Sequence, residues 1–248
     1  MEVRILTAGD QGMVVEFSDT IDFETCKKVH QLSKCIKELR DKRITELVPT
    51  YRSLQIYFNL LKISRNELTD IVNEALAKIK DVELHLPRTR TLYVPTCYEE
   101  EFSPDLEFVA KITNLKPEEV IELHAEKTYQ VYVLGFVVGF PYLGSVSEKI
   151  AIPRLEKPRS KIPAGSVGIG GHQTGIYTVE SPGGWRLIGR TPIRTFLPKK
   201  EDPFFFKPGD EIKFNIIDKK EYDDIKEQVA AGVYVPEIKI VKTAGEFA

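Results

Sequence analysis

Hydrophobic residues in the N-terminal part of the chain recur with helical spacing in two stretches. Apolar side chains three or four positions apart over residues 22–40 predict an amphipathic helix, and Asp22 is suited to cap its start. Residues 64–80 predict a second helix, in which Ser64 and Glu67 have the spacing of a capping box. Each helix is therefore expected to bury one apolar face against a neighbouring layer.

Short alternating runs around these helices predict strands. Residues 3–6 and 13–17 are separated by the turn-forming segment AGDQG and predict a hairpin. Residues 44–58 alternate in the same way, and Pro49 predicts a strand edge or a turn between two short strands. The resulting ββαββα order predicts a small α+β domain over residues 1–86, with its helices on one face of a mainly antiparallel sheet.

The pattern changes after Pro87, which marks the predicted start of a second domain over residues 87–248. Two short helices are predicted at residues 103–113 and 116–125. Eleven of the sixteen glycines then fall within residues 135–189, among short apolar runs. This distribution of glycines among short apolar runs predicts a mainly β domain of many short strands and tight turns, as in a barrel or a sandwich.

The C-terminal tail has two predicted parts. Residues 221–231 are expected to form a helix, and residues 233–242 a last extended segment. The extended segment is either an edge with which a partner chain pairs or a loosely held terminus.

Composition removes several classes of protein. With 248 residues, 42% hydrophobic and 29% charged, the chain is of ordinary globular type, and its formal net charge of -2 provides no field that would attract nucleic acid or an anionic membrane. The three cysteines and four histidines lack redox or metal-ligand spacing, so no metal site is predicted. The absence of a secretion signal and of an apolar run of roughly 20 residues predicts a cytoplasmic protein.

One segment departs from the overall charge balance. Residues 135–198 carry eight basic and three acidic side chains. Because arginine holds carboxylates and phosphates in bidentate geometry, the segment is a candidate anion-binding surface. Its glycines, Gly165, Gly168, Gly170 and Gly171, permit positive φ or close backbone approach, by which amide groups would face a ligand oxygen. The alternatives are that the basic side chains only solvate the outside of a barrel and that the glycines only form turns.

The same segment carries a series of motifs in a fixed order. They are GFPYLG, PR, PR, PAGSVGI, QTGIY, ESPGGW and IGRTP. In this order they closely resemble the KipI-like family, which includes the B-type subunit of bacterial and archaeal 5-oxoprolinase and the first allophanate hydrolase-type subunit. The resemblance extends to VPTYRSLQIYF and to SPDLEFVAKITNLKPEEVIELH, so it covers nearly the whole chain.

The resemblance implies a fold and an activity. The second domain is expected to be a cyclophilin-like β-barrel, and the chain is expected to be similar to one half of the carboxyltransferase domain of urea carboxylase. The implied activity is ATP-dependent opening of the lactam 5-oxo-L-proline to L-glutamate, by a non-autonomous chain that works together with the A-type and C-type subunits. ATP, with magnesium, is then expected at the level of the complex. Since a lactam is a poor electrophile, coupling to phosphoryl transfer provides a better leaving group, and this chemistry needs anion binding.

Eight residues of the second domain form the expected site. We expect Arg154, Arg159 and Gln173 to be the catalytic residues, with the two arginines holding a carboxylate or phosphate and Gln173 supplying a neutral hydrogen bond. The expected substrate-binding residues are Tyr142, Ser166, His172, Ser181 and Trp185. Each has a structural alternative, because arginines also pair with acidic side chains, a glutamine also caps turns, aromatic rings also fill barrels, and His172 also suits an exposed surface.

Two other functions are compatible with the sequence. A KipI-type inhibitor would bind a sensor histidine kinase through an apolar groove and carry out no chemistry. Prolyl isomerisation is suggested by the cyclophilin-like shape alone, and a fold does not determine a function. The substrate also stays open between a lactam, a urea-derived compound and another amide.

Overall fold

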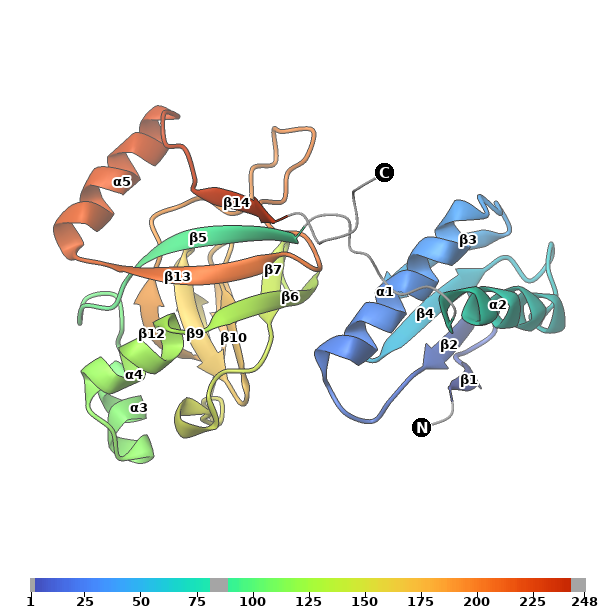
Figure 1. The fold of residues 1–248 in the computed structure, drawn as a ribbon, viewed down its shortest axis with the longest axis horizontal. Coiled ribbons are helices and arrows are strands. Elements are labelled where there is room, and N and C mark those ends of the chain that lie inside the picture. The colour runs from blue at the N-terminus through green and yellow to red at the C-terminus, as the bar shows by residue number, and fades with distance from the viewer. Residues whose placement is uncertain (1–2, 81–88, 242–248) are drawn as a thin grey trace. The chain divides into compact units, whose positions relative to one another are not determined.

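The chain divides into two compact units, Met1–His85 and Leu86–Ala248, and the computed structural model describes residues 3–80 and 89–241 of it (Figure 1). Each unit has its own hydrophobic core. The domain boundary that the sequence predicts at Pro87 lies outside the described residues. Within the described ranges, no helix is both long enough and apolar enough to cross a bilayer.

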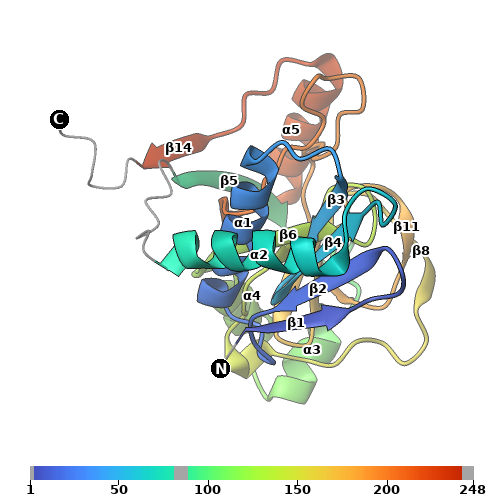
Figure 2. The ribbon, with the colours of Figure 1, turned by 90° about the vertical axis from the view of Figure 1, so that its right-hand side faces the viewer.

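The N-terminal unit is a four-stranded antiparallel sheet packed against two helices (Figure 2). The sheet has the order β1-β2-β4-β3. Its elements are β1 (Arg4–Thr7), β2 (Gly12–Glu16), α1 (Phe23–Glu38), β3 (Ile44–Pro49), β4 (Ser53–Phe58) and α2 (Arg65–Lys80). Alternate residues of the central strands, such as Met13 and Val15, are buried together with Leu32 of α1 and Val72 of α2. The predicted ββαββα order is confirmed, because each element buries the face that its own periodicity marks.

Both helices of this unit begin at the predicted capping residues. Asp22 accepts a hydrogen bond from the backbone N–H of Thr25 at 2.8 Å. Glu67 accepts one from the Ser64 N–H at 2.8 Å, and Ser64 Oγ accepts one from the Glu67 N–H at 3.2 Å. These bonds satisfy backbone groups that have no partner within the helix, which is why the capping signals located both helix starts.

The C-terminal unit is built on a closed barrel of seven strands. Around the ring the order is β12-β9-β10-β7-β6-β13-β5, and the pairing of Arg190 with Cys97 joins β12 back to β5 (Figure 1). The strands are β5 (Thr89–Cys97), β6 (Thr128–Gly135), β7 (Phe140–Leu143), β9 (Ser166–Gly170), β10 (Gln173–Ile176), β12 (Arg186–Arg190) and β13 (Glu211–Ile217). Strands β5 and β13 run parallel, and the other neighbours in the ring run antiparallel. The predicted mainly β barrel is confirmed.

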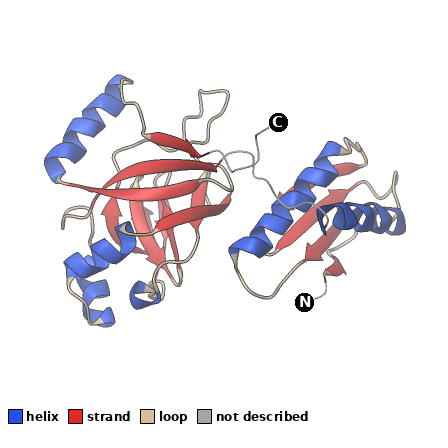
Figure 3. Ribbon diagram, in the orientation of Figure 1, coloured by secondary structure: helices blue, strands red, loops and turns tan. Residues whose placement is uncertain are grey.

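Helices and a short ribbon surround the barrel (Figure 3). They are α3 (Leu106–Thr113), α4 (Pro117–Ala125), the 3-10 helix η1 (Glu148–Ile150), α5 (Lys219–Ala231), and the paired strands β8 (Arg159–Ile162) and β11 (Ser181–Gly183). Helix α3 begins later than predicted, at Leu106 rather than at Ser103. The reason is that Ser103 Oγ donates to the carbonyls of Tyr98 and Glu99, at 2.8 and 2.9 Å, instead of capping the helix.

The C-terminal strand β14 (Ile238–Val241) pairs antiparallel with β5, from Ile238 opposite Leu92 to Val241 opposite Thr89. Strand β14 pairs with the same edge of β5 as β12 does, but at the other end of the strand, because β12 pairs with β5 only at Cys97. The described part of the tail segment therefore pairs within its own chain rather than being loosely held, and β14 is the last strand of the sheet, so an edge with which a partner chain pairs stays a prediction. The physical reason is that β5 is longer than its contact with β12, so its remaining backbone groups need hydrogen bonds.

A chain of hydrogen bonds crosses the barrel core at His124, which is fully buried. Its Nδ1 lies 2.9 Å from the hydroxyl of Tyr98, and its Nε2 lies 2.8 Å from Thr174 Oγ1. Thr174 donates its own hydrogen to the Gly168 carbonyl, so it accepts from Nε2–H, and Nδ1 accepts from Tyr98. Burial lowers the pKa of His124 to about 3 and keeps the ring neutral. The network ties α4 to β9 and β10.

Acidification should destabilise the barrel through His124. The pKa of about 3 in the folded state lies below the unfolded value of about 6.5, so between these pH values the unfolded chain binds a proton that the folded chain does not. Above pH ~6.5 the neutral His124 contributes its full stabilisation. At pH ~5 the free energy of unfolding is lower by about 2 kcal/mol, because the unfolded chain is stabilised by binding a proton. Urea unfolding, followed by the fluorescence of Trp185, the single tryptophan, measures this loss at both pH values.

Two variants separate His124 from other acid-sensitive groups. His124→Gln removes the titration and should flatten this part of the pH dependence, at a cost of about 1–3 kcal/mol at neutral pH from the broken hydrogen bonds. His172→Gln changes an exposed histidine and should leave the profile unchanged. If acidification lowered the free energy of unfolding equally in the wild type and in His124→Gln, the loss could not be assigned to His124.

Candidate functional site

A small aromatic pocket of about 290 Å³ lies beside the β8–β11 ribbon. Strand β7, the segment before β8, and the turn that follows β11 all contribute to its walls. The described lining residues are Phe136, Phe140, Tyr142, Arg154, Leu155, Pro158, Tyr177, Pro182, Gly183, Gly184 and Trp185. We call this set the aromatic pocket.

Glycines of the barrel strands make room for the rings of this pocket. A Cβ atom at Gly170 would lie 2.6 Å from the ring of Trp185, and one at Gly175 would lie 2.7 Å from the ring of Phe140. Gly168 lies on the same side of β9 as Gly170, opposite the residues that face the barrel core. The outward face of the strand at Gly168 and Gly170 is therefore covered by Trp185, so a ligand cannot approach the backbone closely from that side.

The rings of the pocket pack edge to face. Phe140 and Trp185 have ring centroids 5.3 Å apart at 88°, and Tyr142 and Trp185 have centroids 5.9 Å apart at 65°. The rings of Phe136 and Phe140 have centroids 5.7 Å apart at 84°, although Phe136 as a whole residue is 59% exposed. Its φ of 62° is uncommon for a residue with a bulky side chain, and such strain is often found at binding sites. The walls are thus held in place before a ligand enters.

Arg154 supplies the positive charge of the pocket. Its guanidinium carbon lies 5.5 Å from the centroid of the Trp185 ring, and no ion pair of Arg154 is recorded within residues 3–80 and 89–241. Burial raises the pKa of Tyr142 and of Tyr177, while the charge of Arg154 acts in the opposite direction on both. The two phenols therefore stay protonated at neutral pH.

The chemistry of the aromatic pocket is that of a binding site. A guanidinium, two phenolic hydroxyls and flat apolar walls suit a small ring that carries a carboxylate. None of the described lining residues carries a carboxylate, an imidazole or a thiol, so they include no evident general base or nucleophile. A reaction at this pocket would need groups from elsewhere.

Arg159 has a different partner from the ligand that the sequence led us to expect. Its Nη1 and Nη2 donate to the two carboxylate oxygens of Asp105 at 2.9 and 2.8 Å. The same carboxylate accepts from the backbone N–H of Leu187 at 2.6 Å, and only 8% of the Asp105 side chain is exposed. The ion pair fixes the start of β8 against β12 and the start of α3. Arg159 thus anchors the segment that carries Arg154, and its guanidinium is already engaged.

The other expected site residues do not line the pocket. Gln173 opens β10 opposite Gly170 and so faces the same side as Trp185. Ser166 is buried in β9. Ser181 is buried in β11, and its Oγ has no hydrogen-bond partner among the residues that the structure describes. His172 lies at the exposed turn between β9 and β10, where its Nδ1 is 3.3 Å from a Glu148 carboxylate oxygen. Of the eight expected residues, the pocket brings together Tyr142, Arg154 and Trp185.

The basic side chains of residues 135–198 do not converge on one spot. Lys161 pairs with Glu180 at 3.1 Å in solvent, and the Arg186 guanidinium carbon lies 4.0 Å from the centroid of the Phe108 ring. The basic side chains of this segment thus make separate contacts and do not form one positively charged site. Arg154 is the basic side chain found among the described lining residues.

The sequence analysis missed most of the apolar lining of the pocket. Phe140 lies in GFPYLG, Tyr177 in QTGIY, and Gly183 and Gly184 in ESPGGW, so the motifs contained the signal. Phe136 lies outside the quoted motifs, and only the backbone conformation of the β6–β7 turn places its ring at the pocket.

Residues 3–206 match the carboxyltransferase domain family, subdomain C and D. The chain is similar to the B-type subunit of 5-oxoprolinase from Bacillus subtilis strain 168, with 40% identity over 233 residues, which is 91% of this chain and 97% of the relative. Among solved structures, it is similar to a conserved uncharacterized protein of Pyrococcus horikoshii, with 46% identity and a TM-score of 0.52. That match covers 88% of this chain and 100% of the other.

The crystal structure of Kluyveromyces lactis urea carboxylase supports the fold. Its TM-score with this chain is 0.80 at 20% identity, and the match covers 96% of this chain and 24% of that protein. At this identity the likeness concerns the fold alone. The two-unit architecture described above thus occurs within a larger enzyme chain.

Loss of the Asp105 carboxylate should destabilise the barrel. Asp105→Asn leaves the guanidinium of Arg159 without its counter-charge in a mostly buried position, and we expect a loss of about 2–4 kcal/mol in the free energy of unfolding. The measurement is urea unfolding followed by Trp185 fluorescence. Lys161→Ala is the matched control, because it breaks a solvent-exposed pair near the same ribbon and should cost little. An equal loss of unfolding free energy in the two variants would show that the Asp105–Arg159 pair contributes no more to stability than the exposed pair does.

Proposed function

The chain belongs to the carboxyltransferase domain family, subdomain C and D, and on this premise we propose that it is the B-type subunit of an ATP-dependent 5-oxoprolinase. In this proposal it hydrolyses 5-oxo-L-proline to L-glutamate together with the A-type and C-type subunits. The observation that carries the proposal is the 40% identity to a relative of that name over nearly the full length of both chains. The aromatic pocket supports it independently through its chemistry.

The pocket suits the proposed substrate in size and in charge. 5-Oxoproline is a five-membered lactam with one carboxylate, and a volume of about 290 Å³ is near the small end of ligand sites. We propose that Arg154 binds the carboxylate and that the ring lies against Trp185. The hydroxyl of Tyr142 would then donate to an oxygen of the substrate. Arg159 acts as a positioning residue, because its contact with Asp105 fixes the segment that presents Arg154.

The remaining chemistry is assigned to the complex. In balance, 5-oxoproline, ATP and two molecules of water give L-glutamate, ADP and inorganic phosphate. Transfer of the γ-phosphoryl group to the lactam oxygen would activate the ring carbon for attack by water. The ring C–N bond would then break with a proton taken up by the nitrogen, and the second water would release the phosphate. The residues of this chain fit ATP with magnesium poorly. The described residues contain no group of three or more His, Cys, Asp or Glu side chains that could hold a metal ion, and the sequence has no P-loop. We therefore propose that ATP and the groups that activate water are supplied with the partner subunits.

The chain alone should be inactive, and mixing it with the A-type and C-type homologues of the same organism should give ATP-dependent formation of glutamate from 5-oxoproline. The measurement is amino-acid analysis of glutamate, with ADP release as a coupled readout. The control omits each of the three proteins in turn. Absence of glutamate from every combination of the purified proteins would refute the proposal and would favour the KipI-type alternative, which needs no reaction.

Arg154→Gln should weaken binding of the carboxylate without unfolding the barrel. Arg154 is exposed and has no recorded ion pair within the described ranges, so we expect a loss of at most about 1 kcal/mol in the free energy of unfolding, from its contact with Trp185. In the reconstituted complex, we expect a KM for 5-oxoproline raised about tenfold or more, with a smaller change in kcat. Lys157→Gln is the control, since Lys157 is a nearby exposed cation outside the described pocket lining. A KM equal to that of the wild type would remove Arg154 from the proposed site.

A further inference from the structure

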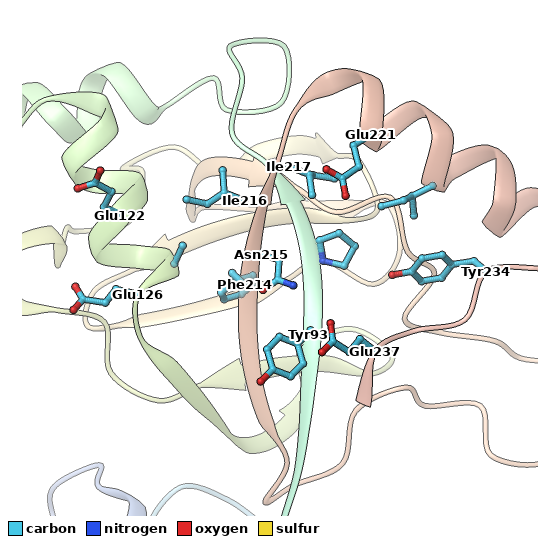
Figure 4. A pocket seen from close by; sticks show the side chains of 13 residues that line it. Tyr93, Glu122, Glu126, Phe214, Asn215, Ile216, Ile217, Glu221, Tyr234 and Glu237 are labelled. Carbon is cyan, nitrogen blue, oxygen red and sulfur yellow. The ribbon is translucent and has the colours of Figure 1, made fainter. Parts of the chain in front are cut away.

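A second surface feature, separate from the aromatic pocket, is an open groove between α4 and α5 (Figure 4). Its floor is formed by β5 and β13, and the segment that leads to β14 closes one side. The cavity volume is about 970 Å³. A neighbouring pocket of about 610 Å³ continues it past the start of α3, and the two share Ile216, Ile217 and Glu221. We call the two together the acidic groove.

All charged residues among the described lining of the groove are acidic. They are Glu99, Glu100, Glu107, Glu118, Glu122, Glu126, Asp218, Glu221 and Glu237. Lys239 forms an ion pair with the Glu237 carboxylate, whereas the ammonium of Lys213 donates to the backbone carbonyl of Glu126. No ion pair of Glu122, Glu126 or Glu221 is recorded for the part of the chain that the structure describes. A chain with a net charge of only -2 therefore gathers a strong negative potential at one place.

An apolar side chain lies exposed on the floor of the same groove. Ile216, shared by both pockets, is 55% exposed. Val233 and Val235, the sequence neighbours of the lining residue Tyr234, are 66% and 84% exposed and are not themselves lining residues. Apolar positions framed by charges of one sign are typical of a surface that another protein covers.

The groove does not have the chemistry of a small-molecule site. Its carboxylates would repel phosphates and carboxylates, including the substrate proposed above. They are also spread along the groove, and no group of three or more His, Cys, Asp or Glu side chains in the described residues could hold a metal ion. A row of separated carboxylates matches a row of separated cations, as on a lysine- or arginine-bearing polypeptide.

The walls of the groove indicate which kind of polypeptide fits. Strand β13 pairs with β5 along its whole length but with β6 only over Glu211–Lys213, and the groove over the rest of β13 is walled by α4 and α5. A helix satisfies its own backbone hydrogen bonds and can lie between two other helices. We propose that the acidic groove docks an amphipathic helix of a protein partner. The apolar stripe of that helix covers Ile216, and its basic margins face Glu122 and Glu126 on α4 and Glu221 on α5.

The proposal does not depend on the 5-oxoprolinase assignment, so it can be tested on the full chain alone. The probe is a synthetic 18-residue peptide of leucine and lysine, with leucines at helical i, i+3, i+4 and i+7 spacing. Titration calorimetry at low ionic strength gives its affinity, and NMR of isoleucine methyl groups gives its position. We expect binding that shifts the methyl signal of Ile216 and leaves that of Ile21 unchanged. These residues are a matched pair, 55% and 48% exposed.

Charge and apolar variants distinguish the groove from nonspecific attraction. The triple variant Glu122→Gln, Glu126→Gln, Glu221→Gln should weaken binding about tenfold or more, and Ile216→Ser should weaken it at unchanged net charge. The matched triple variant Glu24→Gln, Glu38→Gln, Glu74→Gln removes the same charge from exposed positions of the N-terminal unit and should leave the affinity unchanged. Ile21→Ser is the corresponding apolar control.

Several results would overturn the inference. They are absence of peptide binding, equal loss of affinity in the groove and control variants, and equal binding of a scrambled peptide with the same composition but no apolar stripe. Sedimentation of the wild type provides a further check. Concentration-dependent self-association that the groove variants abolish would identify the occupant as a second copy of this chain instead of a basic helix.

Discussion

The buried carboxylate of Asp105 is the constraint on which the aromatic pocket depends. A carboxylate removed from water needs compensating donors, and this one takes two from Arg159 and one from the Leu187 backbone. These bonds join the start of α3, strand β12 and the start of β8. The segment that presents Arg154 to the pocket leads directly into that anchor. The shape of the pocket therefore depends on an ion pair that is not itself part of the pocket lining.

The barrel provides two surfaces of opposite chemistry. In the ring order β12-β9-β10-β7-β6-β13-β5, the strands under the aromatic pocket and those under the acidic groove lie on opposite sides of the ring. The pocket is small and aromatic, with Arg154 at its margin, whereas the groove is long, open and acidic. A closed barrel allows this separation, because its interior is filled by one core and each outward face can vary independently. The proposals for a small carboxylate ligand and for a basic helix are thus compatible within one unit.

The strongly perturbed histidine is a structural group. His124 is fully buried between Tyr98 and Thr174, away from the described lining of the aromatic pocket, and its low pKa results from burial alone. A catalytic base would need to reach the substrate. The described lining residues of the pocket supply binding groups and include no carboxylate, imidazole or thiol that could act as a base.

The sequence by itself determined the local architecture and the identity of the family. The caps at Asp22 and Ser64 were predictable because they depend on contacts three residues apart, and the ordered motifs located the segments that build the pocket. The tertiary structure alone decided which side chains meet. Arg159 pairs with a residue 54 positions earlier, and the groove joins carboxylates from α4, α5 and the tail. Such contacts depend on how the barrel closes, which cannot be predicted from the spacing of residues along the chain.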